Sequence, residues 1–270
     1  MKILFIGDIV GRPGRSIVRN LLPKIKGEFS PDVIMANGEN SAAGVGITKK
    51  VYDELMEMGI DVLTMGNHIW DRKEFLPDIS SCPNLIRPAN YPEGVPGKGS
   101  DIFSSKGVKY GVTNLLGRVF MPCINCPFQM ADSIVPKMKA ETPIILVDFH
   151  GEATSEKNAF AWHFDGKVSA VIGTHTHIQT ADERILPKGT AYITDVGMVG
   201  AYDSVIGVQK EQIIKRFLLS IPEHFEPERQ GPGLFNGLLM NIDDTSGRTT
   251  EIKRIWKVVK DMGKLTPSET

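Results

Sequence analysis

The chain has 270 residues, of which 41% are hydrophobic and 23% charged, a composition that excludes the disordered and membrane-embedded classes. Its 31 basic and 32 acidic side chains nearly cancel and form no long block of one sign, so we do not expect it to bind long nucleic acid, although a small anionic substrate suits this balance. The chain has three cysteines, and it shows neither a signal-peptide pattern nor an apolar run of membrane-spanning length. We therefore predict a cytoplasmic protein that binds no membrane.

Three early segments share one pattern, a short apolar run that predicts a buried strand and ends in a small residue followed by polar side chains. The runs are residues 2–7, 33–36 and 62–65, and the polar side chains after them are Asp8, Glu39, Asn40, Asn67 and His68. In an open α/β sheet the carboxyl ends of such strands face one crevice, where ligands bind. We therefore predict an α/β fold in a single domain over residues 1–270.

Helical patterns fill the gaps between these strands. After a predicted turn at residues 11–14, apolar residues recur with helical spacing over 17–25, although Pro23 should kink or end that helix. A second helix is expected from Thr48, a suitable N-cap, to Gly59, a suitable residue just past its end.

The remainder of the chain continues the alternation. Residues 87–99 are rich in Pro and Gly and predict a surface loop, and a hairpin about residues 106–107 should follow. Strands are then expected at 143–150, ending on His150, at 168–172, leading to His175 and His177, and at 190–195. The last predictions are a helix at 209–220, an antiparallel pair at 234–242 and 249–259, and a frayed end at 263–270.

The polar strand ends together form a set of ligand-type side chains. Taken singly, an Asn after Gly commonly satisfies a turn, and a lone His is more often packed than catalytic. Jointly, carboxylate, amide oxygen and imidazole suit iron, manganese or zinc, and seven ligands fit two cations that share a carboxylate better than one cation. The candidate metal ligands are Asp8, Glu39, Asn40, Asn67, His150, His175 and His177.

The spacing of His175 and His177 adds weight to this interpretation. One residue separates them, so on an extended segment both side chains would point the same way. Each could then reach a different cation of a pair about 3.5–4 Å apart.

These motifs resemble those of the calcineurin-like metallophosphoesterases, and most closely their YmdB-like branch, across nearly the whole chain. The motifs that carry the resemblance are Asp8-Ile9-Val10-Gly11, Gly38-Glu39-Asn40-Ser41, Gly66-Asn67-His68 with Trp70-Asp71, His150, Gly173-Thr174-His175-Thr176-His177 and Asp195-Val196-Gly197-Met198. The resemblance implies a four-layer α/β/β/α sandwich with two mixed sheets.

Two positions depart from the broad superfamily pattern and agree with the YmdB-like branch. Val10 stands where many members have a metal-binding His, and Glu39 stands where they have a bridging Asp. Asn40 is our candidate to complete the first site. The resemblance then implies two ligand sets joined by Glu39, namely Asp8, Glu39, Asn40 and His177 for the first cation, and Glu39, Asn67, His150 and His175 for the second.

His68 is left without a cation in this scheme and is predicted to be the general acid. A hydroxide between two cations can attack phosphorus in line, and a nearby imidazolium can protonate the departing alkoxide. Asp71 could orient that ring, although a carboxylate three residues on also commonly belongs to a helix start.

The function implied by the resemblance is that of a dinuclear-metal phosphodiesterase acting on cyclic nucleotides, 2′,3′-cyclic in particular and 3′,5′-cyclic as a further candidate. Two cations are expected, iron first and manganese or zinc as alternatives. A regulatory protein that binds a nucleotide through the metals with little turnover, and a protein phosphatase or nuclease on the same scaffold, remain alternatives. Homo-oligomerisation stays open.

The pair Cys123 and Cys126 has the spacing of a metal or redox motif, but no second cysteine pair or nearby His accompanies it. We therefore interpret this segment as a loop turn between two prolines.

Overall fold

The strand β1 (Lys2–Ile6) shows how the apolar runs are used in the structure, a computed structural model that describes residues 1–262. Leu4 and Ile6 pack into a core on one face of the sheet, whereas Ile3 and Phe5 pack into a second core on the other face. All four side chains are fully buried. A strand covered on both faces belongs to a layered α/β fold, which explains its nearly continuous apolar sequence.

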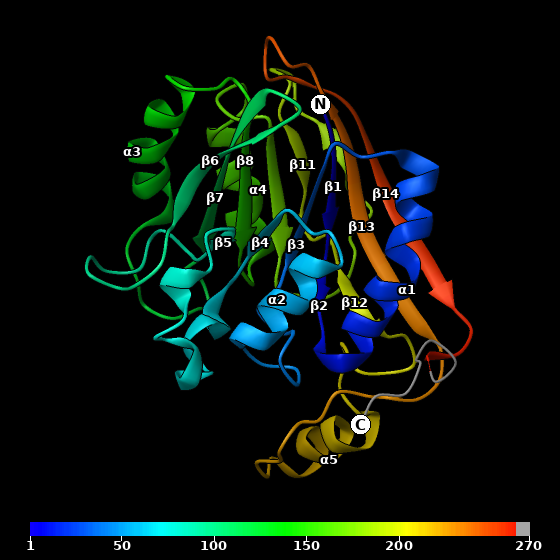
Figure 1. The fold of residues 1–270 in the computed structure, drawn as a ribbon. Coiled ribbons are helices and arrows are strands. Elements are labelled where there is room, and N and C mark those ends of the chain that lie inside the picture. The colour runs from blue at the N-terminus through cyan, green and yellow to red at the C-terminus, as the bar shows by residue number, and fades with distance from the viewer. Residues whose placement is uncertain (263–270) are drawn as a thin grey trace.

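Two mixed sheets pack face to face (Figure 1). The first has the order β2 (Asp8–Ile9), β12 (Met198–Ala201), β13 (Gly233–Ile242), β1, β3 (Val33–Asn37), β4 (Val62–Thr64) and β5 (Leu85–Ile86), and β14 (Thr249–Val259) also pairs with β13. The second has the order β10 (Arg184–Ile185), β11 (Ala191–Ile193), β9 (Ala170–Thr174), β8 (Ile145–His150), β7 (Val108–Leu116) and β6 (Ser100–Ser105).

Helices cover the outer face of each sheet. On the first sheet lie α1 (Gly11–Phe29) and α2 (Lys49–Glu57), and on the second lie α3 (Pro127–Lys139) and α4 (Thr154–His163) (Figure 1). The helix α5 (Lys210–Leu219) projects at the end of the molecule. Three short 3₁₀ helices follow β4, namely η1 (Asn67–Trp70), η2 (Lys73–Phe75) and η3 (Ile79–Ser81). The predicted four-layer α/β/β/α sandwich is thus confirmed.

Parallel pairing aligns the strand ends that the sequence marked as polar. In the first sheet β1, β3 and β4 are parallel neighbours, and in the second β7, β8 and β9 are. The register pairs Asn37 with Thr64 and His150 with Thr174. The polar loops from both sheets therefore leave at one edge of the sandwich, as expected for a site at carboxyl ends of strands.

Most local predictions are confirmed. The Thr48 hydroxyl accepts a hydrogen bond from the backbone N–H of Val51, so it caps α2, and Gly59 follows the helix with a φ of 86°. The hairpin β6–β7 turns at Lys106 and Gly107, both at positive φ, and β13–β14 form the expected antiparallel pair.

Other local predictions need correction. The helix α1 already begins at Gly11, where a turn was expected, and it continues through Pro23 to Phe29. Burial of Leu22 and Ile25 on either side of the proline stabilises the continuous helix enough to offset one missing hydrogen bond. The helix α3 and the short strands β2, β5 and β10 had no clear pattern in the sequence. The predicted frayed end, residues 263–270, lies outside the described residues.

Within residues 1–262, no helix combines the length and the apolar composition that a membrane crossing requires.

Candidate metal centre

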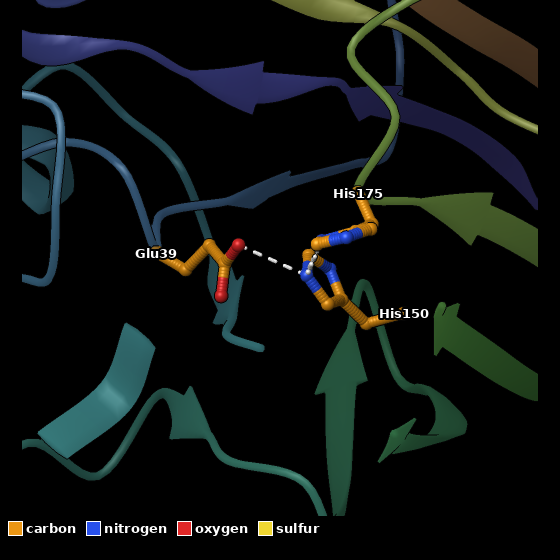
Figure 2. Close-up of side chains that lie close together, drawn as sticks. All are labelled: Glu39, His150 and His175. Atoms are coloured by element: carbon orange, nitrogen blue, oxygen red, sulfur yellow. Dashed lines mark hydrogen bonds and ion pairs between the residues drawn. The ribbon is translucent and has the colours of Figure 1, made fainter. Parts of the chain in front are cut away.

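Three side chains from both sheets form the core of the site (Figure 2). Glu39 follows β3, His150 ends β8, and His175 follows β9. The Nε2 atom of His150 lies 2.9 Å from Glu39 Oε1 and 3.0 Å from His175 Nδ1. The three atoms that can bind a cation all lie within 4.8 Å of one another. A carboxylate and two imidazoles at this spacing are a suitable ligand set for a transition metal.

Hydrogen bonds on the far side of His150 determine which nitrogen faces this cluster. The Thr174 hydroxyl donates a hydrogen bond to Asp148 Oδ1 at 2.6 Å. Its oxygen therefore accepts a hydrogen bond from the N–H at Nδ1 of His150, at 2.8 Å. His175 is oriented likewise, because its Nε2 lies 3.2 Å from the Glu152 carboxylate. Nε2 of His150 and Nδ1 of His175 are therefore the ring atoms that face the cluster and could bind a cation, and outer partners orient both rings as in metal sites.

The charges of the cluster depend on one another. Burial opposes the charge of Glu39, but the charge and hydrogen bond of His150 outweigh it and lower the pKa of Glu39 to about 2. Burial likewise opposes the charge of His150, whereas Glu39 raises its pKa to about 9. Burial and the charge of His150 lower the pKa of His175 to about 3. A cation that binds here would thus replace the proton on Nε2 of His150. Metal ions and protons generally compete for a ligand atom in this way.

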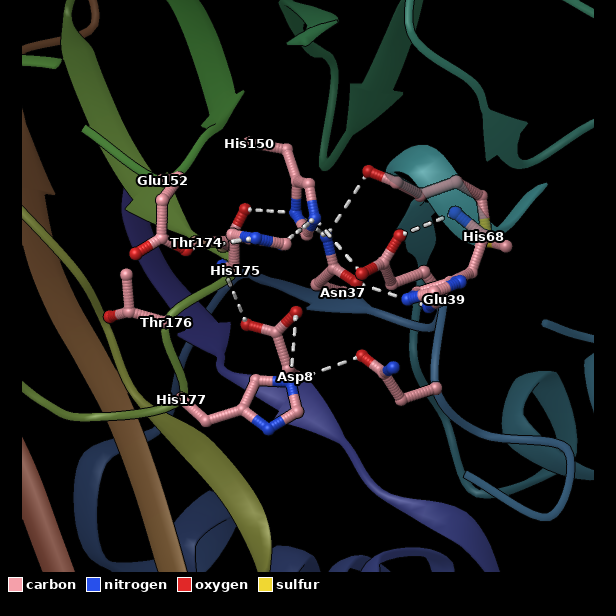
Figure 3. Close-up of polar contacts among 12 residues, drawn as sticks. Asp8, Asn37, Glu39, His68, His150, Glu152, Thr174, His175, Thr176 and His177 are labelled. Carbon is pink, nitrogen blue, oxygen red and sulfur yellow. Dashed lines mark hydrogen bonds and ion pairs between the residues drawn. The ribbon is translucent and has the colours of Figure 1, made fainter. Parts of the chain in front are cut away.

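A second group of acceptor atoms lies beside the first (Figure 3). Nδ1 of His177 donates to the carbonyl of Ile206 at 2.9 Å, which leaves Nε2 as an acceptor. The Asn40 amide donates to the Gly44 carbonyl at 3.1 Å, so Asn40 Oδ1 is the atom that lies 3.2 Å from His177 Nε2. Two lone pairs facing each other repel unless a cation or a proton lies between them.

Asp8 and Asn67 supply further acceptors without partners. Asp8 Oδ1 lies 4.0 Å from His177 Nε2, and neither it nor Asn67 Oδ1 has a hydrogen-bond partner in the part of the chain that the structure describes. Both atoms are buried. Burial raises the pKa of Asp8 well above its usual value. Buried acceptors of this kind cost free energy unless a cation or donor satisfies them, so the residues present fit metal ions.

Gly66 allows the strand ends to approach this closely. A Cβ atom at Gly66 would lie 2.3 Å from Glu39 Oε2 and 2.4 Å from His150 Nε2. Because such distances are far below van der Waals contact, only glycine leaves room for the cluster.

The segment that carries His175 and His177 is not extended, which corrects the expectation from their spacing. Both residues have left-handed backbone conformations, with φ values of 103° and 66°. The two side chains therefore diverge: His175 reaches His150, and His177 reaches Asn40. The His175 backbone N–H lies 3.4 Å from Asp8 Oδ2, which connects the two groups.

A buried ion pair holds this strained segment in place. Nζ of Lys157 on α4 donates to the Thr174 carbonyl at 2.7 Å and to Asp195 Oδ2 at 2.9 Å. The same carboxylate oxygen accepts from the Thr176 backbone N–H at 2.9 Å. Lys157 and Asp195 are both fully buried. Their interaction fixes the segment on both sides of His175.

His68 lies at the rim of the site, with its ring about one third exposed. Its backbone N–H donates to Glu39 Oε2 at 3.0 Å, and its Nδ1 lies 2.7 Å from Asp71 Oδ2. Asp71 is thus placed to orient the ring. His68, His175 and His177 line a cavity of about 380 Å³.

Sequence reasoning missed the residues that support the ligands. The Asn37 amide donates to Asp148 Oδ2 at 3.1 Å and to the Met65 carbonyl at 3.2 Å, and its oxygen accepts from the Glu39 backbone N–H. The signal available in the sequence was Asp148, a carboxylate that interrupts the apolar run before His150. Cys123 and Cys126 are free thiols in the irregular segment before α3, consistent with the loop interpretation.

The fold and this site define a class, the calcineurin-like metallophosphoesterases. A putative 5′-nucleotidase from Staphylococcus aureus shares the fold, with a TM-score of 0.60 at 15% identity over 96% of this chain and 54% of that chain. A phosphatase from Mycoplasma pneumoniae is much closer, with a TM-score of 0.91 at 38% identity over 98% of this chain and 95% of that chain.

The chain belongs to the YmdB-like protein family, whose model matches residues 4–255. It is 51% identical over 255 residues to a 2′,3′-cyclic-nucleotide 2′-phosphodiesterase of Bacillus subtilis, covering 94% of this chain and 96% of the relative. The predicted family is thereby confirmed, and so is the prediction that the chain is a hydrolase of phosphate esters.

Proposed function

We propose that this protein hydrolyses 2′,3′-cyclic nucleotides at a centre of two cations. The observation that carries the proposal is the pair of adjacent acceptor groups, one around His150 and one around His177, together with the buried and unpaired acceptors Asp8 Oδ1 and Asn67 Oδ1. The activity named for the Bacillus subtilis relative supports the substrate class. The 3′,5′-cyclic nucleotides are a second substrate to test.

The seven ligands divide between the two cations in this proposal. Asp8, Asn40 and His177 hold the first, Asn67, His150 and His175 hold the second, and Glu39 contributes to both. The mixture of imidazole nitrogen and carboxylate or amide oxygen suits iron, with manganese or zinc as alternatives. When bound, the cations polarise the phosphoryl oxygens and acidify a water molecule.

His68 donates the proton that the leaving group needs. Water adds to phosphorus and releases one proton to solvent, the bond from phosphorus to O2′ breaks, and the proton on Nε2 of His68 passes to O2′, so the product is a nucleoside 3′-phosphate. The Asp71 carboxylate, 2.7 Å from Nδ1, orients the ring, which lines the cavity.

The direct test is an assay of the purified, metal-loaded protein across 2′,3′-cyclic nucleotides, 3′,5′-cyclic nucleotides, open diesters and monoesters. We expect the 2′,3′-cyclic nucleotides to give the highest kcat/KM and a 3′-monophosphate product. Tight, metal-dependent nucleotide binding without turnover would instead favour a regulatory role, and monoesterase activity alone would overturn the proposal.

Replacement of His68 by Ala should lower kcat about 100-fold, the lower part of the range for general acid catalysis, and leave the metal content nearly unchanged. Steady-state kinetics and mass-spectrometric metal analysis measure the two effects. His163→Ala is a matched control, because His163 is an exposed residue of α4 whose ring contacts Asp132. Loss of metal in the His68 variant would make His68 a ligand and refute its role as the acid.

A further inference from the structure

The cavity beside the candidate metal centre is lined by side chains of two chemical kinds. His68, His175 and His177 line it, and so do the apolar side chains of Ile206, Val208 and Phe225, which have no role in the proposed hydrolysis. Its volume of about 380 Å³ lies within the range of small-molecule sites. A cavity lined by both polar and apolar side chains suits a ligand that has both polar and apolar parts.

Ile206 occupies an unusual position for its residue type. Val205 and Val208 exchange two backbone hydrogen bonds, of 2.9 and 3.0 Å, so Ile206 and Gly207 form a two-residue hairpin turn. Both have positive φ, 47° and 95°. Such turns favour Asn, Asp or Gly, whereas a β-branched residue at positive φ is strained.

The side chain of Ile206 gains little that would offset this strain. It is 44% exposed, so its burial contributes only part of the usual hydrophobic stabilisation. Its carbonyl accepts a hydrogen bond from Nδ1 of His177, but any residue at this position would supply a carbonyl. A strained, exposed apolar side chain beside a reactive centre indicates a role in ligand binding.

Backbone hydrogen bonds connect the segment of Ile206 to the segment of Phe225. The backbone N–H of Gln209 donates to the Glu226 carbonyl at 3.1 Å, and that of Glu228 donates to the Gly207 carbonyl at 2.9 Å. The Arg216 guanidinium lies 4.9 Å from the centroid of the Phe225 ring. The Phe225 ring is thus in contact with α5 through Arg216.

We propose that Ile206 and Phe225 form the subsite for the base of the cyclic nucleotide. This inference rests on the proposed function, which places the cyclic phosphate at the metal ligands. The planar, weakly polar base would then contact these apolar side chains, and its stacking on an aromatic ring is worth roughly a tenfold change in affinity or more. The subsite tolerates different bases, because stacking uses a face that every base has.

The test compares adenosine 2′,3′-cyclic phosphate with a base-free analogue, the 2′,3′-cyclic phosphate of 1-O-methylribose. Replacement of Phe225 by Ala should raise KM for the nucleotide about tenfold, with a smaller change in kcat, and should alter KM for the analogue less than twofold. Phe217→Ala is the matched control, because Phe217 is 82% exposed on α5 and does not line the cavity. Its kinetics should match those of the unchanged protein.

A second variant separates binding from folding. Ile206→Asn keeps the carbonyl that holds His177 and fits the turn better, so Tm should not fall, while KM for the nucleotide should rise. Equal losses on nucleotide and analogue in both variants, or no loss in either, would overturn the base subsite. If the unchanged protein cleaves neither compound, the proposed function itself has failed.

Discussion

Replacement of Glu39 by Gln is expected to deplete both cations from the purified protein. Glu39 is fully buried, and one of its oxygens lies 2.9 Å from Nε2 of His150. The amide has nearly the same shape but no charge, so two neighbouring cations would lose the anion that they share. We expect occupancy to fall below about half at each site, and mass-spectrometric metal analysis against protein concentration measures it.

Two further variants make the interpretation of this result specific. Glu39→Asp keeps the charge on a side chain one methylene shorter, so it should retain more metal than Glu39→Gln. Glu211→Gln removes an exposed carboxylate in the first turn of α5, which does not line the cavity, and it should retain both cations. If Glu39→Gln holds two cations at full occupancy, the bridging role is refuted.

Replacement of Lys157 by Met should both destabilise the fold and weaken metal binding. Lys157 is fully buried, and its loss leaves the Asp195 carboxylate without its ion-pair partner. Breaking one partner of a buried pair costs about 3–5 kcal/mol, so Tm should fall by about 10 °C. The segment with His175 and His177 would also lose a restraint, which should reduce metal affinity.

A double-mutant cycle distinguishes the ion pair from simple packing. Lys157→Met combined with Asp195→Asn removes both charges, so it should recover part of the free energy of unfolding lost in Lys157→Met alone. Lys167→Met is the control, because Lys167 is about half exposed and its replacement should change stability by less than about 0.5 kcal/mol. The single variant Asp195→Asn completes the cycle, and thermal unfolding followed by circular dichroism measures all four variants. Additive effects would show that the two residues act independently.

The candidate ligands could be found in the sequence because they follow a local rule. Each occurs directly after a short apolar run, and parallel pairing brings such strand ends to one edge. Asp8, Glu39 and His150 therefore lie together although they are distant in sequence. Their role as metal ligands stays a prediction until metal is measured.

The supporting residues could not be found in the same way. Asn37, Asp148 and Thr174 lie inside or at the ends of strands, where sequence alone does not tell a structural polar residue from one that orients a ligand. Their role depends on which strands are neighbours: β8 pairs with β9 and brings Thr174 beside His150. The ion pair of Lys157 with Asp195 likewise depends on how α4 packs against the second sheet.

The sequence by itself determined the layered α/β architecture, because burial on both faces requires continuous apolar strands, and it determined the residue types available at the strand ends. The tertiary structure alone decided how these residues are distributed between the two acceptor groups, one around His150 and one around His177. The left-handed backbone at His175 and His177 sends one ring toward His150 and the other toward Asn40. The hairpin at Ile206 lies far along the chain and reaches the site only through folding, since its contacts with His177 come from packing between distant segments.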